Sequence, residues 1–114
     1  MDKVALVKEF QTFQQAVFVN NQDHGFWDEG VAVANKAEKI ALMHSELSEA
    51  LEVLRHGNGP SDHIPAFSGV EEELADVIIR IMDFAEAFGF RIAEAVLEKH
   101  EFNVKRPFKH GKQF

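Results

Sequence analysis

The stretch VEEELADVIIRIMDFAEAF, residues 70–88, decides the fold class. Its apolar residues recur three and four positions apart, the spacing of an α-helix. They also cover more than one side of such a helix, as the following residues show: Leu74, Val77, Ile78, Ile79, Ile81, Met82, Phe84 and Phe88. A helix that is apolar all round is buried. A chain of 114 residues has too few layers to bury it alone, so we expect a homo-oligomer, either a dimer or a tetramer.

Start and stop signals bound this helix. Ser68 is a suitable N-cap, and the acids of residues 71–73 suit the positive end of the helix dipole. Gly89 follows the last apolar residue, where glycine commonly ends a helix. The sequence therefore predicts a helix from about Val70 to Phe88.

Three further helices are expected on either side of it. Their predicted ranges are about Lys3 to Val19, about Val33 to Arg55 and about Arg91 to Asn103. Residues 20–28, NNQDHGFWD, and residues 57–69, GNGPSDHIPAFSG, are predicted as loops because they are rich in turn formers. No segment alternates like a strand. We expect a single all-α domain over residues 1–114, resembling a four-helix bundle, with a basic irregular segment at about 104–114.

Composition narrows the class of protein. A net charge of −7 argues against binding a nucleic-acid polymer, which requires a basic face. The absence of Cys excludes disulfides and thiolate chemistry and is compatible with the cytoplasm, where we expect the protein. Charged residues interrupt the N-terminal segment, which resembles neither a signal peptide nor a membrane span. We expect neither a nucleic-acid nor a membrane partner.

Two pairs of acids stand out on the second and third predicted helices. Glu46 and Glu49 lie three residues apart, as do Glu73 and Asp76. Residues at this spacing project from nearly the same side of a helix. If the two helices pack antiparallel, the pairs can face each other and form one group of four carboxylates.

Four adjacent carboxylates repel one another unless a cation lies between them. Oxygen ligands suit Mg²⁺ or Mn²⁺, and Mg²⁺ often shares carboxylates with substrate phosphates. A di-iron centre is a weaker interpretation, because no His follows a Glu by three residues. A single pair of acids at this spacing is more often part of the solvated surface of a helix. Their position beside apolar residues favours a metal site.

The same residues resemble a known superfamily. The pattern ExxE on one helix and ExxD on the next is similar to that of the all-α nucleotide pyrophosphohydrolases, which include MazG, the dimeric dUTPases and the phosphoribosyl-ATP pyrophosphohydrolases. HGFWD from His24, HSELSEALE from His44, EELADVIIRIMD from Glu72 and the ending FNVKRPFKHGKQF resemble the short MazG-like subgroup. The resemblance covers nearly the whole chain.

The resemblance implies hydrolysis of an NTP or dNTP to the monophosphate and pyrophosphate, by attack of water at the α-phosphorus. Carried over by position, the metal ligands and catalytic acids are Glu46, Glu49, Glu73 and Asp76. Mg²⁺ is the implied cofactor, with Mn²⁺ as an alternative, and the implied role is house-cleaning of the nucleotide pool. Two alternatives stay open: a non-catalytic helical module that binds a nucleotide or protein, and a dUTPase-like or phosphoribosyl-ATP-type activity.

Residues outside the acidic pairs supply candidate substrate contacts. Four residues near the C-terminus suit phosphate or sugar oxygens: Lys99, Asn103, Arg106 and Lys109. Trp27 is the first candidate for stacking on the base, with Phe26 and Asp28 behind it. Asp83 either reaches the sugar or pairs with Arg80, and the ion pair is the favoured interpretation.

Overall fold

The computed structural model describes residues 1–114 and contains four α-helices and no strand. The helices are α1 (Lys3–Asp23), α2 (Lys36–Arg55), α3 (Gly69–Phe88) and α4 (Ile92–Val104). Two short 3-10 turns, η1 (Val31–Val33) and η2 (Phe108–Gly111), lie in the connections. The predicted all-α architecture of four helices is confirmed.

Local hydrogen bonds explain where α3 begins and ends. The Ser68 side chain accepts a hydrogen bond from the Glu71 backbone N–H, and the Glu71 carboxylate accepts one from the Ser68 backbone N–H. This reciprocal cap satisfies two N–H groups that the helix itself leaves unpaired. Gly89 ends the helix with φ of 72°, in the left-handed region that favours glycine. Both predicted signals are confirmed.

Two predicted helix boundaries are wrong by several residues. Helix α1 continues to Asp23 instead of ending at Val19, and the His24 N–H still bonds to the Asn20 carbonyl at 3.1 Å. The polar residues of this segment tolerate a solvent-exposed helical end, and the chain turns only at Gly25, where φ is 86°. Helix α2 begins at Lys36 instead of Val33 because the Asn35 side chain caps it through the Glu38 N–H.

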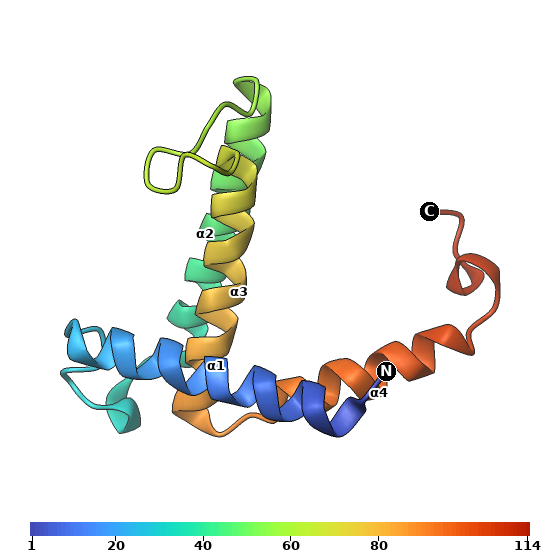
Figure 1. Cartoon of the computed structure of the whole chain (residues 1–114), viewed down its shortest axis with the longest axis horizontal. Helices are drawn as coiled ribbons and strands as arrows, with labels where there is room; N and C mark the ends of the chain where they lie inside the picture. The colour runs from blue at the N-terminus through green and yellow to red at the C-terminus, as the bar shows by residue number, and fades with distance from the viewer.

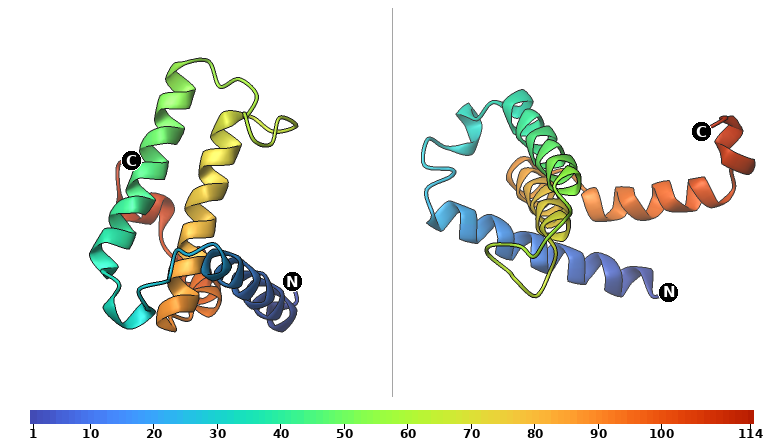
Figure 2. Two further views of the ribbon diagram at one scale, coloured as in Figure 1. Left: turned by 90° about the vertical axis from the view of Figure 1, so that its left-hand side faces the viewer. Right: turned by 90° about the horizontal axis from the view of Figure 1, so that it is seen from above.

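The helices form an open arrangement (Figures 1 and 2). Helices α2 and α3 lie side by side and run in opposite directions, making a hairpin closed by residues 56–68. Helix α1 crosses the C-terminal half of α3, and α4 extends away from the foot of the hairpin beside the N-terminal part of α1. The C-terminal segment therefore lies apart from the hairpin.

The chain buries few side chains. Only 10 of 114 residues are buried, and no large side chain is fully enclosed. The largest cluster is aromatic: Trp27 packs against Phe18 and Phe88 at ring-centroid distances of 5.8 and 5.9 Å, and Phe84 contacts Phe88 at 5.1 Å. This cluster holds the loop after α1 against the C-terminal half of α3. None of the four helices is long and apolar enough to span a bilayer.

Candidate functional site

The two acidic pairs meet between α2 and α3. Because the helices are antiparallel, the i,i+3 pair of α2 faces that of α3. One carboxylate oxygen from each of Glu46, Glu49 and Glu73 lies within 4.8 Å of the other two. We call these three residues the glutamate cluster. Asp76, one turn further along α3, lies beside it and is not within that limit.

This arrangement disfavours the charged form of the Glu73 carboxyl group. Burial, and then the neighbouring Glu49 and Glu46, raise the pKa of Glu73 to about 7. Its Oε2 atom is shielded from solvent and has no hydrogen-bond partner. A buried polar atom without a partner is unfavourable. The cluster therefore has an oxygen that a cation or a donor would stabilise.

The negative charge of Glu46 is balanced by Arg80. The Arg80 Nε donates to Glu46 Oε1 at 2.9 Å. Burial opposes ionisation of Glu46, but hydrogen bonding from Arg80 and within the cluster lowers its pKa overall. The favoured pairing of Arg80 with Asp83 is therefore wrong. Arg80 reaches across to α2, which leaves Asp83 to another partner.

That partner is Trp27. The Trp27 Nε1–H donates to the two Asp83 carboxylate oxygens at 3.0 and 3.2 Å. Trp27 is only 6% exposed, and the Lys39 ammonium lies 4.4 Å from the centroid of its ring. Trp27 is thus a packed wall residue, oriented by Asp83 and covered in part by Lys39. Phe26, its neighbour in the chain, is 68% exposed.

A cavity of about 310 Å³ opens beside the glutamate cluster. The residues that line it come from α2, α3 and the end of α1 with its following loop: Asn21, Phe26, Trp27, Lys39, Glu46, Asp76, Ile79, Arg80, Asp83 and Phe84. Within this cavity, burial and then the Glu46 charge raise the pKa of Asp76. Carboxylates, cations and aromatic rings therefore surround one hollow.

Sequence patterns missed two residues of this cavity. Lys39 lies seven positions before Glu46, two turns along the same face of α2, and this spacing is the signal that could have placed it near the acids. Asn21 carried no such signal, because its segment was predicted to be a loop and is the last turn of α1.

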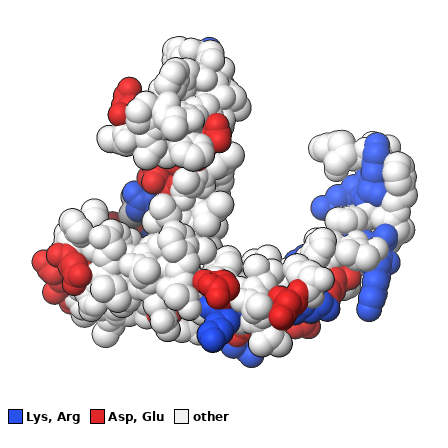
Figure 3. Space-filling view, viewed as in Figure 1, with Lys and Arg blue, Asp and Glu red and all other residues white.

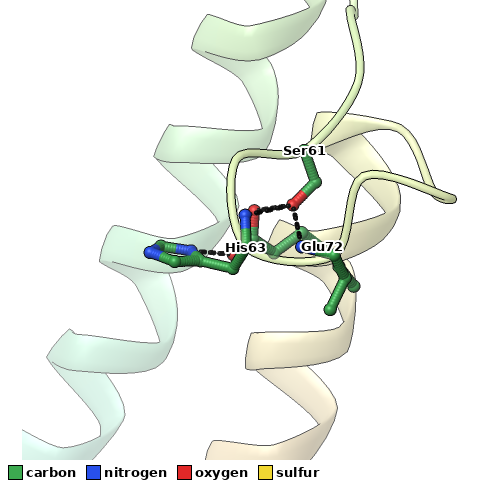
Figure 4. A network of polar contacts seen from close by, with 4 residues as sticks. Ser61, His63 and Glu72 are labelled. Atoms are coloured by element: carbon green, nitrogen blue, oxygen red, sulfur yellow. Dashed lines mark hydrogen bonds and ion pairs between the residues drawn. The ribbon is translucent and has the colours of Figure 1, made fainter.

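A second cavity, of about 400 Å³, lies on the other side of the cluster. It is lined by Glu49 and Glu73 together with residues of the connector between α2 and α3. Figure 4 shows how this connector is held. The Ser61 hydroxyl donates to one Glu72 oxygen, and the His63 ring contacts the other at 2.5 Å.

Backbone N–H groups complete this connector network. Those of His63 and Ile64 donate to Ser61 Oγ at 3.3 and 3.1 Å. The bond to Glu72 raises the pKa of His63, while the bonds from Ser61 and His63 lower that of Glu72. No sequence pattern indicated this network, because Glu72 was interpreted only as a helix-start acid. It fixes the connector beside the glutamate cluster.

The predicted phosphate contacts lie elsewhere. Lys99 and Asn103 are on α4, whereas Arg106 and Lys109 follow it. Figure 1 shows α4 and the segment after it extending away from the α2–α3 hairpin. Lys99 and Arg106 lie over the Phe102 ring, at 4.6 and 5.5 Å from its centroid. The Asn103 side-chain oxygen is shielded and has no partner. A single chain therefore does not bring the predicted cations to the acids.

The fold and these residues define an all-α protein of four helices with carboxylates gathered between two of them. Comparisons with protein families, with characterised proteins and with solved structures find no match to this chain. The assignment of a function consequently rests on the residues themselves.

Proposed function

We propose that this protein is a Mg²⁺-dependent nucleotide pyrophosphohydrolase, with Mn²⁺ as an alternative ion. Its substrate is an NTP or dNTP, and its products are the monophosphate and pyrophosphate. The observation that carries the proposal is the glutamate cluster. Together with Asp76 it has the ExxE and ExxD spacing that resembles that of the MazG-like enzymes. The role that this resemblance implies is removal of unwanted nucleotides from the pool.

The donor set fits such an ion. Glu46, Glu49 and Glu73 would hold it, with Asp76 beside them, and all offer the oxygen atoms that Mg²⁺ prefers. The shielded, unpaired Oε2 of Glu73 supports the assignment, because a cation would remove both its lack of a partner and its repulsion from Glu49. A bound ion of this kind polarises phosphoryl oxygens and acidifies water.

The chain's own residues divide the remaining tasks. Asp76 lines the 310 Å³ cavity next to Glu46, so its carboxylate is placed to take a proton from the attacking water. Arg80 holds Glu46 in position through its 2.9 Å bond. Asp83 orients the Trp27 ring. These contacts favour one geometry for the groups that surround the reacting phosphate.

The cavity also suits a nucleoside. Trp27 supplies an aromatic wall and remains the candidate for base binding, while the exposed Phe26 offers a ring that a base can cover. Asn21 and Lys39 supply donors for base or sugar oxygens. The residues proposed to bind the triphosphate are those of the C-terminal part of the chain: the cations Lys99, Arg106 and Lys109, and the Asn103 amide.

A nucleotide panel tests the proposal. Ribo- and deoxynucleoside triphosphates are assayed with and without Mg²⁺, and pyrophosphate is resolved from phosphate. We expect Mg²⁺-dependent pyrophosphate with an equal amount of monophosphate, lost in Glu49→Gln and in Asp76→Asn but retained in Glu9→Gln on α1. Pyrophosphate release only from dUTP or phosphoribosyl-ATP would favour those narrower activities. No release from any nucleotide would favour a non-catalytic binding module.

A further inference from the structure

The Asp83 carboxylate lines the 310 Å³ cavity without a cation to balance its charge. Its hydrogen-bond donor is the Trp27 indole N–H, which is neutral and is shared between the two carboxylate oxygens at 3.0 and 3.2 Å. Asp83 forms no ion pair. Each oxygen of a carboxylate can accept two hydrogen bonds, so each keeps a free acceptor position. A half-buried charge of this kind favours a ligand that donates to it.

The two cations of the cavity are directed to other groups. The Arg80 Nε donates to Glu46 at 2.9 Å. The Lys39 ammonium lies 4.4 Å from the centroid of the Trp27 ring and forms no ion pair. Figure 3 shows a further group of Lys and Arg on the segment after α4, apart from the hairpin. Asp83 is therefore available to a donor that a ligand brings.

Trp27 holds Asp83 in place and leaves the stacking of a base to another ring. The Trp27 ring packs between Phe18 and Phe88, at centroid distances of 5.8 and 5.9 Å, and little of it reaches solvent. Phe26 is exposed and lines the same cavity. Aromatic faces bind bases without regard to their identity. A base in this cavity can therefore cover Phe26, while the choice between bases falls to the polar groups of the wall.

We propose that Asp83 selects the base, and that the substrates are nucleotides whose base carries an exocyclic amino group, such as cytosine or adenine. This inference rests on the proposed function. A carboxylate accepts a hydrogen bond from the amino group of such a base, and a bond to an ionised acceptor is stronger than one between neutral groups. Uracil, thymine and hypoxanthine carry a carbonyl oxygen at the same place. An oxygen that faces a carboxylate is repelled, so Asp83 disfavours these bases.

The other free polar groups of the cavity suit the same bases. Lys39 and the Asn21 amide both line it and both carry N–H donors. Cytosine and adenine each present a ring-nitrogen acceptor next to the amino group. An acceptor at Asp83 together with donors at Lys39 or Asn21 therefore matches the donor and the acceptor of one base edge.

Matched substrate pairs test the proposal. The pairs are dCTP with dUTP and dATP with dITP, in which an amino group is replaced by an oxygen, and kcat/KM is measured for each in Mg²⁺. We expect wild type to prefer the amino-bearing member by about tenfold or more, the discrimination that one hydrogen bond to a charged group supplies. Asp83→Asn should bring the ratio close to one, because an amide both donates and accepts. Equal kcat/KM within the pairs, or a ratio that Asp83→Asn leaves intact, would overturn the proposal.

Two further variants separate base selection from a structural role. If Asp83 only oriented Trp27, Asp83→Asn would lower kcat/KM for all nucleotides by the same factor and leave the ratio unchanged. Trp27→Phe removes the indole N–H but keeps the carboxylate, so it should retain the preference for the amino-bearing base. Glu86→Gln is the matched control, because Glu86 lies three residues further along α3, contacts Gln14 and does not line the cavity. This control should keep both the activity and the ratio of wild type.

Binding without turnover separates this inference from the proposed function. Trp27 is the chain's single tryptophan and lies in the cavity wall, so its fluorescence reports occupancy. We expect dCMP and dAMP to bind about tenfold or more tighter than dUMP and dIMP, and Asp83→Asn to lose this difference. Wild type that cleaves no nucleotide but binds with this preference would remove the proposed function and keep the base selection. Cleavage without preference within the pairs would keep the function and remove the selection, and absence of both cleavage and binding would remove both.

Discussion

At the scale of single residues, Glu73 links the packing of the hairpin to its chemistry. Its carboxyl group is pushed toward its neutral form by burial and by two neighbouring glutamates, with a pKa of about 7 in place of 4.5. Between those two pH values the folded protein holds a proton that the unfolded chain has released. Stability of the metal-free protein must therefore fall as pH rises from about 4.5 to about 7.

Glu73→Gln should remove this dependence. The amide carries no charge at any pH, so the metal-free variant should melt several degrees above wild type at pH 8, since about 1 kcal/mol corresponds to roughly 4–8 °C in a domain of this size. Mg²⁺ should raise the melting temperature of wild type and leave the variant nearly unchanged. Calorimetry with and without EDTA measures both effects. Glu9→Gln is the control, and a variant that responds to Mg²⁺ like wild type would contradict the assignment.

His63 and Glu72 give a second residue-scale prediction. Their contact raises the pKa of His63 above 6.5 and lowers that of Glu72 below 4.5. The His63 contribution is present below pH 6.5 and is lost as pH rises through the raised pKa; the Glu72 contribution is present above pH 4.5 and is lost on acidification. The contact should therefore hold the connector most firmly between these two values.

NMR titration of the His63 ring checks this prediction. Glu72→Gln should move the pKa of His63 back toward 6.5, because the partner charge and its hydrogen bond are gone. Glu71→Gln is the matched control, since Glu71 contacts Ser68 and not His63. An unchanged titration in Glu72→Gln would show that the contact is absent in solution.

At the scale of helices, sequence patterns predicted correctly the features that depend on neighbouring residues alone. Ser68 and Gly89 bound α3 because capping and left-handed φ depend on neighbouring residues alone. The spacing of Glu46, Glu49 and Glu73 also anticipated their meeting, since helical periodicity sets the face. The pairing of Asp83 with Trp27 joins residues 56 positions apart. No local pattern contains that information, and so Arg80 was assigned to the wrong acid.

At Gly69, the close packing of α2 and α3 favours glycine, and no sequence pattern indicated this. A Cβ atom at this position would lie 2.7 Å from Val53 Cγ1, too close for two carbon atoms. The first turn of α3 therefore approaches α2 most closely where a side chain is absent. Spacing between the helices here also sets the distance between the glutamates one turn below.

Gly69→Ala should force α2 and α3 apart at this end. Overpacking of this kind costs roughly 1–3 kcal/mol, and the displaced Glu73 should weaken the response to Mg²⁺. Thermal melts and Mg²⁺ titrations measure the two effects. Gly59→Ala is the control, because nothing lies within 4 Å of a Cβ there and its φ is ordinary. Equal melting temperatures of the two variants would show that the Val53 side chain moves aside at little cost in free energy.

At the scale of the whole molecule, the chain leaves apolar surface exposed because it is short and its third helix is apolar on several sides. That pattern predicted burial by another copy, and the protomer alone leaves Leu74 and Ile78 about half exposed. The position of α4 and of the basic segment after it could not be predicted, because the direction of α4 depends on its packing against α1 and on the turn at Gly89. If a second copy covers these side chains, as the sequence pattern predicts, stability should depend on association.

Association should therefore be visible in the melting temperature. Because a partner that binds only the folded state adds stability by mass action, the wild-type melting temperature should rise with protein concentration. Leu51→Glu places a charge on the side of α2 where Leu47, Leu51 and Leu54 are about half exposed in one chain, so the helices can form while association is prevented. Sedimentation should find this variant monomeric at micromolar concentration, with a melting temperature independent of concentration. Ala41→Glu, exposed on the polar side of α2, should stay dimeric. A wild-type melting temperature that does not change on dilution would mean that these leucines stay exposed to solvent.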